Sequence, residues 1–200
     1  MTKRKATLSS ILITLFITVV SYAAFLSAAD HFSLRLPAAP APSAGTTITA
    51  PPGYYIVTQS VDGDTFQVDI DGKKESVRLI GVDTPETHKP NTPVQCQGPE
   101  AADFTRQTLE GKPVQLVADP TNDNRDRYDR LLRYAYTQDG TLFNRLLIEK
   151  GFGFAYTSFP FQKTDEFLAA QTAAQANKVG LWSLCQAYQE KSGRWQTNPY

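Results

Sequence analysis

The sequence is poor in the residues that build zinc sites and most acid–base pairs. Only two cysteines and two histidines occur among its 200 residues, and we find no internal repeat. Two cysteines far apart in the chain are too few for a zinc site. His31 lies beside an apolar run and His88 lies in a polar loop, so neither is convincingly placed as a catalytic base. We expect both histidines to be ordinary surface residues.

Net charge is also absent, because 20 basic residues balance 20 acids. Residues 1–52 hold four bases and one acid, whereas residues 53–200 hold 16 bases and 19 acids. A module that binds nucleic acid mainly through its overall field is basic. Any phosphate chemistry here must therefore depend on a local site, with a metal to offset the acids.

The N-terminal segment has the pattern of an export signal. A basic run, Lys3–Lys5, precedes the uncharged and mostly apolar Ala6–Ala29. The apolar run is longer than a usual signal-peptide core and long enough to span a bilayer, and Ser27–Ala29 is a permissible cleavage site. Residues 1–29 therefore predict either a cleaved signal peptide or an uncleaved transmembrane anchor. The protein is then secreted, or held in the membrane through residues 6–29 with the remainder outside the cytoplasm.

The next segment, residues 30–52, is rich in Pro and Ala and predicts a linker. Further along lie the only cysteines, Cys96 and Cys185. In an exported protein an even pair favours a disulfide, with two free thiols as the alternative.

Strand and helix patterns alternate over residues 53–188, which we predict to be one domain. Strands are expected at residues 54–60, 61–70, 75–82, 113–118 and 130–137. Helices are expected at residues 99–110, 142–150 and 165–178, the last capped by Thr164. This order favours a β-rich α+β fold, a five-stranded OB-fold barrel with about three packed helices. We expect Phe167, Leu168, Trp182 and Leu184 to pack inward, and residues 189–200 to form a polar, frayed tail.

The stretch Val61–Glu86 gathers acids and one arginine on a predicted hairpin. Asp71-Gly72 is a strong hairpin-turn signal, so the chain returns and brings Asp64 and Asp83 to one end of a sheet. Carboxylates gathered in this way predict a hard cation such as Ca²⁺. Arg78 lies between them, and an arginine fork matches a phosphate. Asp62-Gly63-Asp64 alone is better explained as a turn, and Asp83-Thr84-Pro85 alone as the end of a strand. The two fragments together with Arg78 favour a site for a cation and a phosphate.

Hydrolysis of a phosphodiester requires neutralised charge, a positioned water and help for the leaving oxygen. Asp64 and Asp83 are suitable Ca²⁺ ligands, and Pro85 stiffens the loop after Thr84. Glu86 is the natural candidate to orient or deprotonate water. Arg78 and a second arginine would hold the phosphate.

Several motifs occur in the order and spacing of one known family. VDGDT, RLIGVDTPET, QGPEA, DRYDR and GLW resemble the thermonuclease, or staphylococcal-nuclease-like (SNase-like), family from residue 54 to residue 182. The resemblance implies an OB-fold nuclease that binds one Ca²⁺ and hydrolyses DNA and RNA to 3′-phosphate ends. The expected substrates are single-stranded or locally melted DNA and RNA, and the expected state is a monomer.

The resemblance also implies individual roles. The implied catalytic residues are Arg78, Glu86 and Arg130. The implied metal ligands are the carboxylates of Asp64 and Asp83 and the carbonyl of Thr84, with Asp62 behind them. The implied substrate contacts are Arg127, Tyr128 and Tyr156.

One position departs from the family pattern, which usually has Gly where this chain has Asp129. Asp129 either pairs with Arg130 and weakens its hold on phosphate, or faces water. All six catalytic and metal positions are filled, which favours an active enzyme. The alternatives are a non-catalytic OB module at the cell surface, which binds nucleic acid or protein, and an OB module with a structural Ca²⁺ site. Neither alternative explains the two arginines together with the glutamate.

Overall fold

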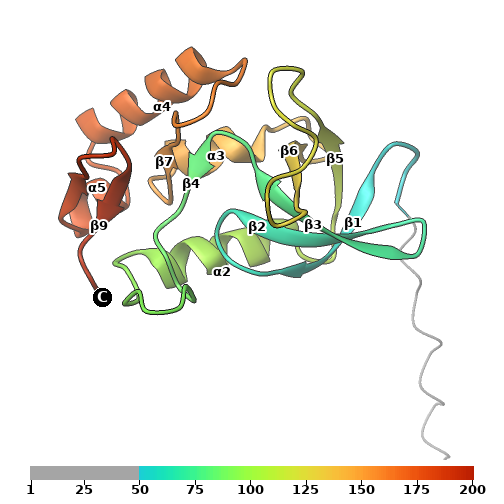
Figure 1. The fold of residues 1–200 in the computed structure, drawn as a ribbon, viewed down its shortest axis with the longest axis horizontal. Helices are drawn as coiled ribbons and strands as arrows, with labels where there is room; N and C mark the ends of the chain where they lie inside the picture. The colour runs from blue at the N-terminus through green and yellow to red at the C-terminus, as the bar shows by residue number, and fades with distance from the viewer. Residues whose placement is uncertain (1–49) are drawn as a thin grey trace, which may run out of the picture. The chain divides into compact units, whose positions relative to one another are not determined.

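The structure, a computed structural model, describes residues 50–200, and these residues build a closed five-stranded barrel (Figure 1). β3 and β6 pair in parallel, and the other neighbouring strands are antiparallel. The strands in spatial order are β1 (Tyr55–Ser60), β2 (Thr65–Ile70), β3 (Lys73–Leu79), β6 (Leu131–Tyr136) and β5 (Pro113–Val117). The barrel confirms the predicted β-rich α+β class and the OB-fold.

The β2–β3 hairpin turns at the expected residues. Asp71 and Gly72 have φ angles of 54° and 80°, as a two-residue hairpin turn of the mirror-image type requires. The register pairs Thr65 with Arg78 and Ile70 with Lys73. This pairing places Arg78 beside the residue that follows Asp64.

Alternating side chains of the strands fill the barrel, and helices close it. Phe66 and Val77 are fully buried, and so is Phe143 from α3. The helices are α2 (Gly98–Leu109), α3 (Phe143–Glu149), α4 (Thr164–Ala176) and the single turn α5 (Leu181–Leu184). Figure 1 shows α2 along the lower edge of the barrel, and α4 and α5 on the side that also holds β9.

A small second sheet positions the chain after β3. β4 (Val82–Asp83) pairs with β7 (Phe154–Ala155), with Asp83 opposite Phe154. No strand is expected from the sequence at residues 154–155, because the two-residue strand β7 is too short to leave a pattern. The pairing fixes the backbone of Asp83 outside the barrel.

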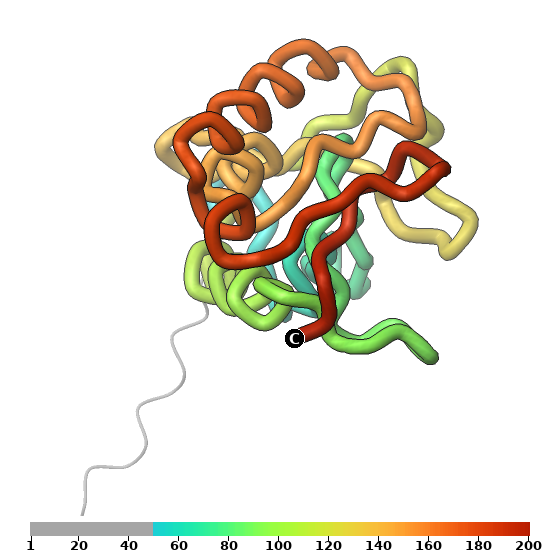
Figure 2. Tube along the Cα trace, turned by 90° about the vertical axis from the view of Figure 1, so that its left-hand side faces the viewer, coloured from blue at the N-terminus to red at the C-terminus, as the bar shows by residue number. Residues whose placement is uncertain are grey.

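The end of the chain packs on the domain, so the expectation of a frayed tail is wrong. β8 (Ala187–Gln189) and β9 (Trp195–Thr197) form a hairpin, here called the C-terminal hairpin. Trp195 lies 5.9 Å from the ring of Phe154 and 5.2 Å from the ring of Trp182, so a large aromatic side chain anchors an otherwise polar segment. Figure 2 shows this red segment returning toward the green loop that precedes α2.

Three local expectations also fail. Thr164 is the first residue of α4 and donates to the carbonyl of Phe161 rather than capping the helix. Leu168 is 41% exposed, because its neighbour Phe167 takes the inward position and successive helical residues point about 100° apart. Leu184 is 66% exposed, because α5 has only one turn and its Leu181 takes the buried side.

Ala6–Ala29 and most of the linker lie outside the described residues. Over residues 50–200, every helix is too short or too polar to cross a bilayer.

Candidate active site

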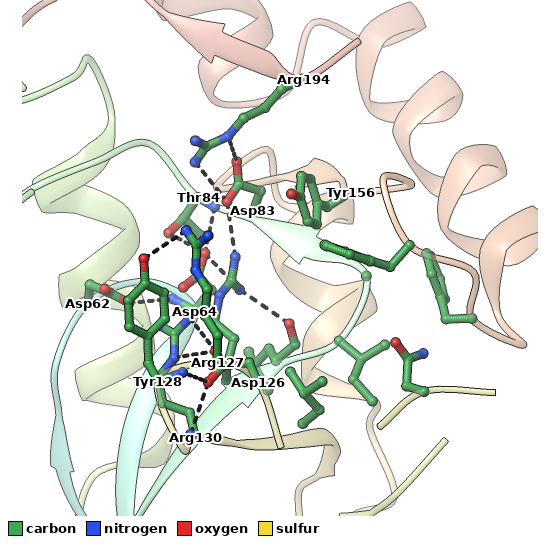
Figure 3. Close-up of a pocket in the computed structure, with 18 of the residues that line it drawn as sticks. Asp62, Asp64, Asp83, Thr84, Asp126, Arg127, Tyr128, Arg130, Tyr156 and Arg194 are labelled. Carbon is green, nitrogen blue, oxygen red and sulfur yellow. Dashed lines mark hydrogen bonds and ion pairs between the residues drawn. The ribbon is translucent and has the colours of Figure 1, made fainter. Parts of the chain in front are cut away.

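A cleft of about 820 Å³ lies beside the end of β3 and the starts of β2 and β6 (Figure 3). It is lined by parts of residues 62–89, by the loop 122–130, by parts of residues 156–161, and by Arg194. All the residues assigned above to catalysis, metal or substrate line this one cleft: Asp62, Asp64, Arg78, Asp83, Thr84, Glu86, Arg127, Tyr128, Arg130 and Tyr156. Segments that are far apart in the sequence therefore meet here.

Two buried aspartates share one arginine at the centre of the cleft. Arg78 Nη1 lies 3.0 Å from Asp64 Oδ2, and Arg78 Nη2 donates to Asp83 Oδ1 at 3.0 Å. Nη1 also donates to the carbonyl of Val82 at 2.8 Å. The aspartates are only 5% and 6% exposed. The hairpin and β4 thus bring the two acidic fragments together around Arg78.

Burial dominates the electrostatics of the two aspartates. It raises the pKa of Asp64 to about 6, although nearby Arg78 lowers it, and it also raises the pKa of Asp83. Additional positive charge would therefore stabilise both carboxylates. Over residues 50–200 no three His, Cys, Asp or Glu residues form a cluster that could hold a metal ion. The two carboxylates are oxygen donors of the kind that a hard cation such as Ca²⁺ prefers, and the predicted carbonyl ligand of Thr84 would add a third oxygen.

The turn before β2 holds Asp64 in place. The backbone N–H of Asp64 donates to Asp62 Oδ1 at 3.1 Å, so the Asp62 side chain stabilises the turn. Asp64 Oδ2 accepts from the backbone N–H of Thr84 at 2.9 Å, and Oδ1 accepts from Thr65 Oγ1 at 3.1 Å. A Cβ on Gly63 would lie 2.6 Å from Thr84 Oγ1, so a side chain there would push Thr84 away. These contacts connect the segment of Asp64 rigidly to the segment of Asp83 and Thr84.

Glu86 lies at the edge of the cleft with its backbone fixed. Its N–H donates to Gln95 Oε1 and its carbonyl accepts from the N–H of Gln95, both at 2.9 Å. A Cβ on Gly98 would lie 2.9 Å from the same carbonyl oxygen, which explains the glycine of the QGPEA motif. The carboxylate oxygen Oε1 accepts from Arg194 Nη2 at 3.2 Å.

Arg130 is held by an acid, but not by the one expected. Its Nε and Nη2 lie 2.7 and 2.6 Å from Asp126 Oδ2, and its backbone N–H donates to Asp126 Oδ1. The expected alternative, a pair between Arg130 and Asp129, is not made. The Asp129 side chain is 84% exposed and lies 3.5 Å from Arg125. Its φ of 63° is in the left-handed region that glycine favours, which explains why glycine suits this position.

The expected substrate contacts lie on two walls of the cleft. Tyr128 is 64% exposed, and its ring lies 4.8 Å from the guanidinium of Arg127 and 5.3 Å from that of Arg130. Its hydroxyl accepts from Arg127 Nη2 at 2.8 Å. Tyr156 lies on the other wall, where its N–H donates to the carbonyl of Gly81.

Arg194 is a residue of the cleft that the sequence analysis does not identify. It is carried by the C-terminal hairpin, and its guanidinium makes two hydrogen bonds to Asp83 and one to Glu86. The neighbouring Trp195, a large aromatic residue in a polar segment, is the feature of the sequence that indicates packing of this segment on the domain. A disulfide joins Cys96 to Cys185, just before this hairpin, with a Cα–Cα distance of 5.8 Å.

The barrel and the cleft together define an OB-fold protein equipped to act on phosphodiesters. The profile of the family described as "Staphylococcal nuclease homologue" matches residues 76–184. The chain is 45% identical over 130 residues to "Thermonuclease" of Staphylococcus hyicus, covering 64% of this chain and 75% of the relative. It is 42% identical over 129 residues to "Thermonuclease" of Staphylococcus intermedius, with the same coverage. It is also 39% identical over 127 residues to "Endonuclease YncB" of Bacillus subtilis, covering 62% and 59%.

The chain belongs to the staphylococcal nuclease family. It is a nuclease, a hydrolase that acts on the phosphodiester bonds of nucleic acid.

Proposed function

We propose that the protein is a Ca²⁺-dependent nuclease that cleaves DNA and RNA and leaves 3′-phosphate ends. The observation that carries this proposal is the Asp64–Arg78–Asp83 arrangement, with Glu86 and Arg130 in the same cleft. Two buried carboxylates form a cation site, and the arginines beside them are suited to the oxygens of a phosphate.

Each side chain has a distinct task in the proposed reaction. Glu86 orients a water molecule and accepts its proton as the water oxygen bonds to phosphorus. The bond from phosphorus to the 5′-oxygen breaks, this oxygen takes up a proton, and the phosphate stays on the 3′-oxygen. Arg78 and Arg130 donate to the phosphate oxygens as negative charge develops on them. When bound by Asp64 and Asp83, Ca²⁺ would supply further charge neutralisation.

The proposed substrate is a single strand or a locally melted duplex. Tyr128 exposes a flat ring close to the guanidinium groups of Arg127 and Arg130, and unpaired bases stack on such exposed rings. Tyr156 provides a second aromatic surface in the cleft. A base that is free to leave its stack is needed for these contacts, so a continuous duplex is expected to be cut more slowly.

We also propose that the enzyme works outside the cytoplasm. Residues 3–29 have the composition of an export signal, and the Cys96–Cys185 disulfide suits an oxidising compartment. Cell fractionation with mass measurement of the mature chain tests this proposal. A cytoplasmic protein that keeps residues 1–29 would contradict it.

A cleavage assay tests the nuclease proposal. The full-length chain in mild detergent is incubated with labelled single-stranded DNA or RNA, in Ca²⁺ or in chelator. Cleavage is expected only with Ca²⁺, and the products should resist polymerase extension until a phosphatase removes their 3′-phosphate. Glu86→Ser and Arg130→Ala are expected to lower kcat about a hundredfold or more.

The matched control is Arg106→Ala, which removes a half-exposed arginine on α2 that pairs only with Asp103 over the described residues. It should cleave like the wild type. Full activity of Glu86→Ser and Arg130→Ala, or cleavage by the wild type in chelator, would sink the proposal.

A further inference from the structure

Arg194 connects a proposed metal ligand to the proposed water-handling acid. Its Nε donates to Asp83 Oδ2 at 2.7 Å, and its Nη2 donates to Asp83 Oδ1 at 3.1 Å. The same Nη2 donates to Glu86 Oε1 at 3.2 Å. One planar guanidinium therefore fixes the two carboxylates relative to each other. Figure 3 shows the Arg194 guanidinium directed at Asp83.

Arg194 is not a loosely held surface residue, because its side chain is only 25% exposed. The C-terminal hairpin that carries it is held at several points. Thr197 Oγ1 donates to the carbonyl of Cys96 at 2.9 Å, and the N–H of Cys96 donates to the carbonyl of Asn198 at 2.8 Å. Trp195 packs between aromatic rings, and the disulfide closes the start of the hairpin.

The same hairpin supports the segment that carries Glu86. Gln95, whose side chain and backbone bond to the backbone of Glu86, also donates to Gln196 Oε1 at 3.2 Å. Gln95 forms a β-bridge with Pro199 as well. The C-terminal hairpin therefore holds Glu86 twice, through its backbone and through the Arg194 guanidinium.

We propose that Arg194 is a positioning residue of the active site, which sets the Glu86 carboxylate relative to Asp83. The proposal rests on the proposed function, because it assigns Glu86 to the water and Asp83 to the cation. Residue 194 lies beyond residue 184, where the family match ends, so the match itself does not cover this contact.

A second consequence concerns the cation. The positive charge of Arg194 lies against Asp83 and opposes a second positive charge on the same carboxylate. Removing it should tighten Ca²⁺ binding while catalysis becomes slower. A merely structural role predicts the opposite for Ca²⁺, because a loosened Asp83 would bind it more weakly.

The test compares wild-type protein with Arg194→Met and Arg194→Lys, as full-length chains with the disulfide formed. Arg194→Met should lower kcat about tenfold to a hundredfold, as loss of a group that orients a ligand typically does, with little change in KM. Arg194→Lys should restore part of kcat, because one ammonium can still bridge the carboxylates. Lys191→Met is the matched control, since it removes the same charge from an exposed position on the same hairpin, and it should match the wild type.

Calorimetric titration of Ca²⁺ without nucleic acid is the second measurement. Arg194→Met should bind Ca²⁺ about two- to fivefold more tightly, the range for removal of a partly exposed charge. The inference is overturned if Arg194→Met keeps the wild-type kcat, or if its Ca²⁺ affinity falls together with its kcat. An inactive wild type would instead refute the proposed function, so the two failures are distinguishable.

Discussion

Asp119 holds two walls of the cleft together, and its removal provides a quantitative test of the structure. Its Oδ1 accepts from the side chain of Thr121 at 2.6 Å. Its Oδ2 accepts from the Tyr134 hydroxyl at 2.5 Å and from the backbone N–H of Gln162 at 2.7 Å. Thr121 belongs to the loop that leads to Arg130, and Gln162 follows the segment that begins at Tyr156.

The free energy follows from the pKa of Asp119. Burial alone would raise this pKa, but the hydrogen bonds outweigh burial and hold it at about 2, compared with an ordinary value of 3.8. At about 1.4 kcal/mol per unit, the ionised side chain contributes about 2 kcal/mol to the free energy of unfolding at neutral pH. The side chain is only 3% exposed, so solvent screening is weak. Because the folded pKa is the lower one, this contribution is present above pH 4 and is lost as the pH falls toward 2.

Urea unfolding of wild-type protein and Asp119→Asn tests this value, because asparagine has the shape of the protonated acid. The variant should be less stable by about 2 kcal/mol at pH 7 and by about 1 kcal/mol at pH 3, and the difference should vanish at lower pH. Other titrating groups are common to both proteins and cancel. A difference that stays constant between pH 7 and pH 3 would refute the assignment of the hydrogen bonds to the ionised carboxylate.

Three further perturbations have expected outcomes. Asp129→Gly should raise the free energy of unfolding by about 1 kcal/mol in urea, because residue 129 has a positive φ, and should leave cleavage equal or higher; a large loss of activity would assign the acid a role of its own. Replacing Cys96 and Cys185 by serine should lower stability by about 4.6 kcal/mol, from loop-closure entropy over a separation of 89 residues; a loss below about 1 kcal/mol would contradict this. Asp126→Asn should lower kcat/KM about tenfold, because Arg130 loses its ionic partner; unchanged kinetics would show that Arg130 needs no such support.

Much of the barrel and of the site was predictable because the causes are local in the chain. The alternation over residues 65–79 and the Asp71-Gly72 turn determine the hairpin with little help from the rest of the chain. Several site residues are also predictable because they are close together in the sequence. Asp83, Thr84 and Glu86 lie within four positions, so placing one of them places the others.

Other features depended on the closed fold. Whether Asp126 or Asp129 pairs with Arg130 is decided by backbone angles in a loop, and both acids fit the sequence equally well. The β4–β7 pairing has only two residues on each strand, which is too few to produce an alternation of apolar and polar residues in the sequence.

The sequence by itself determined the barrel, the acid pair and Arg78, because alternation, a hairpin turn and closely spaced motif residues act over short stretches of chain. Only the tertiary structure decided that Arg194 joins Asp83 and Glu86, which precede it by more than a hundred residues. The physical reason is that the hairpin carrying Arg194 is held by the disulfide and by the packing of Trp195 on Phe154 and Trp182, and both form only when distant segments come together.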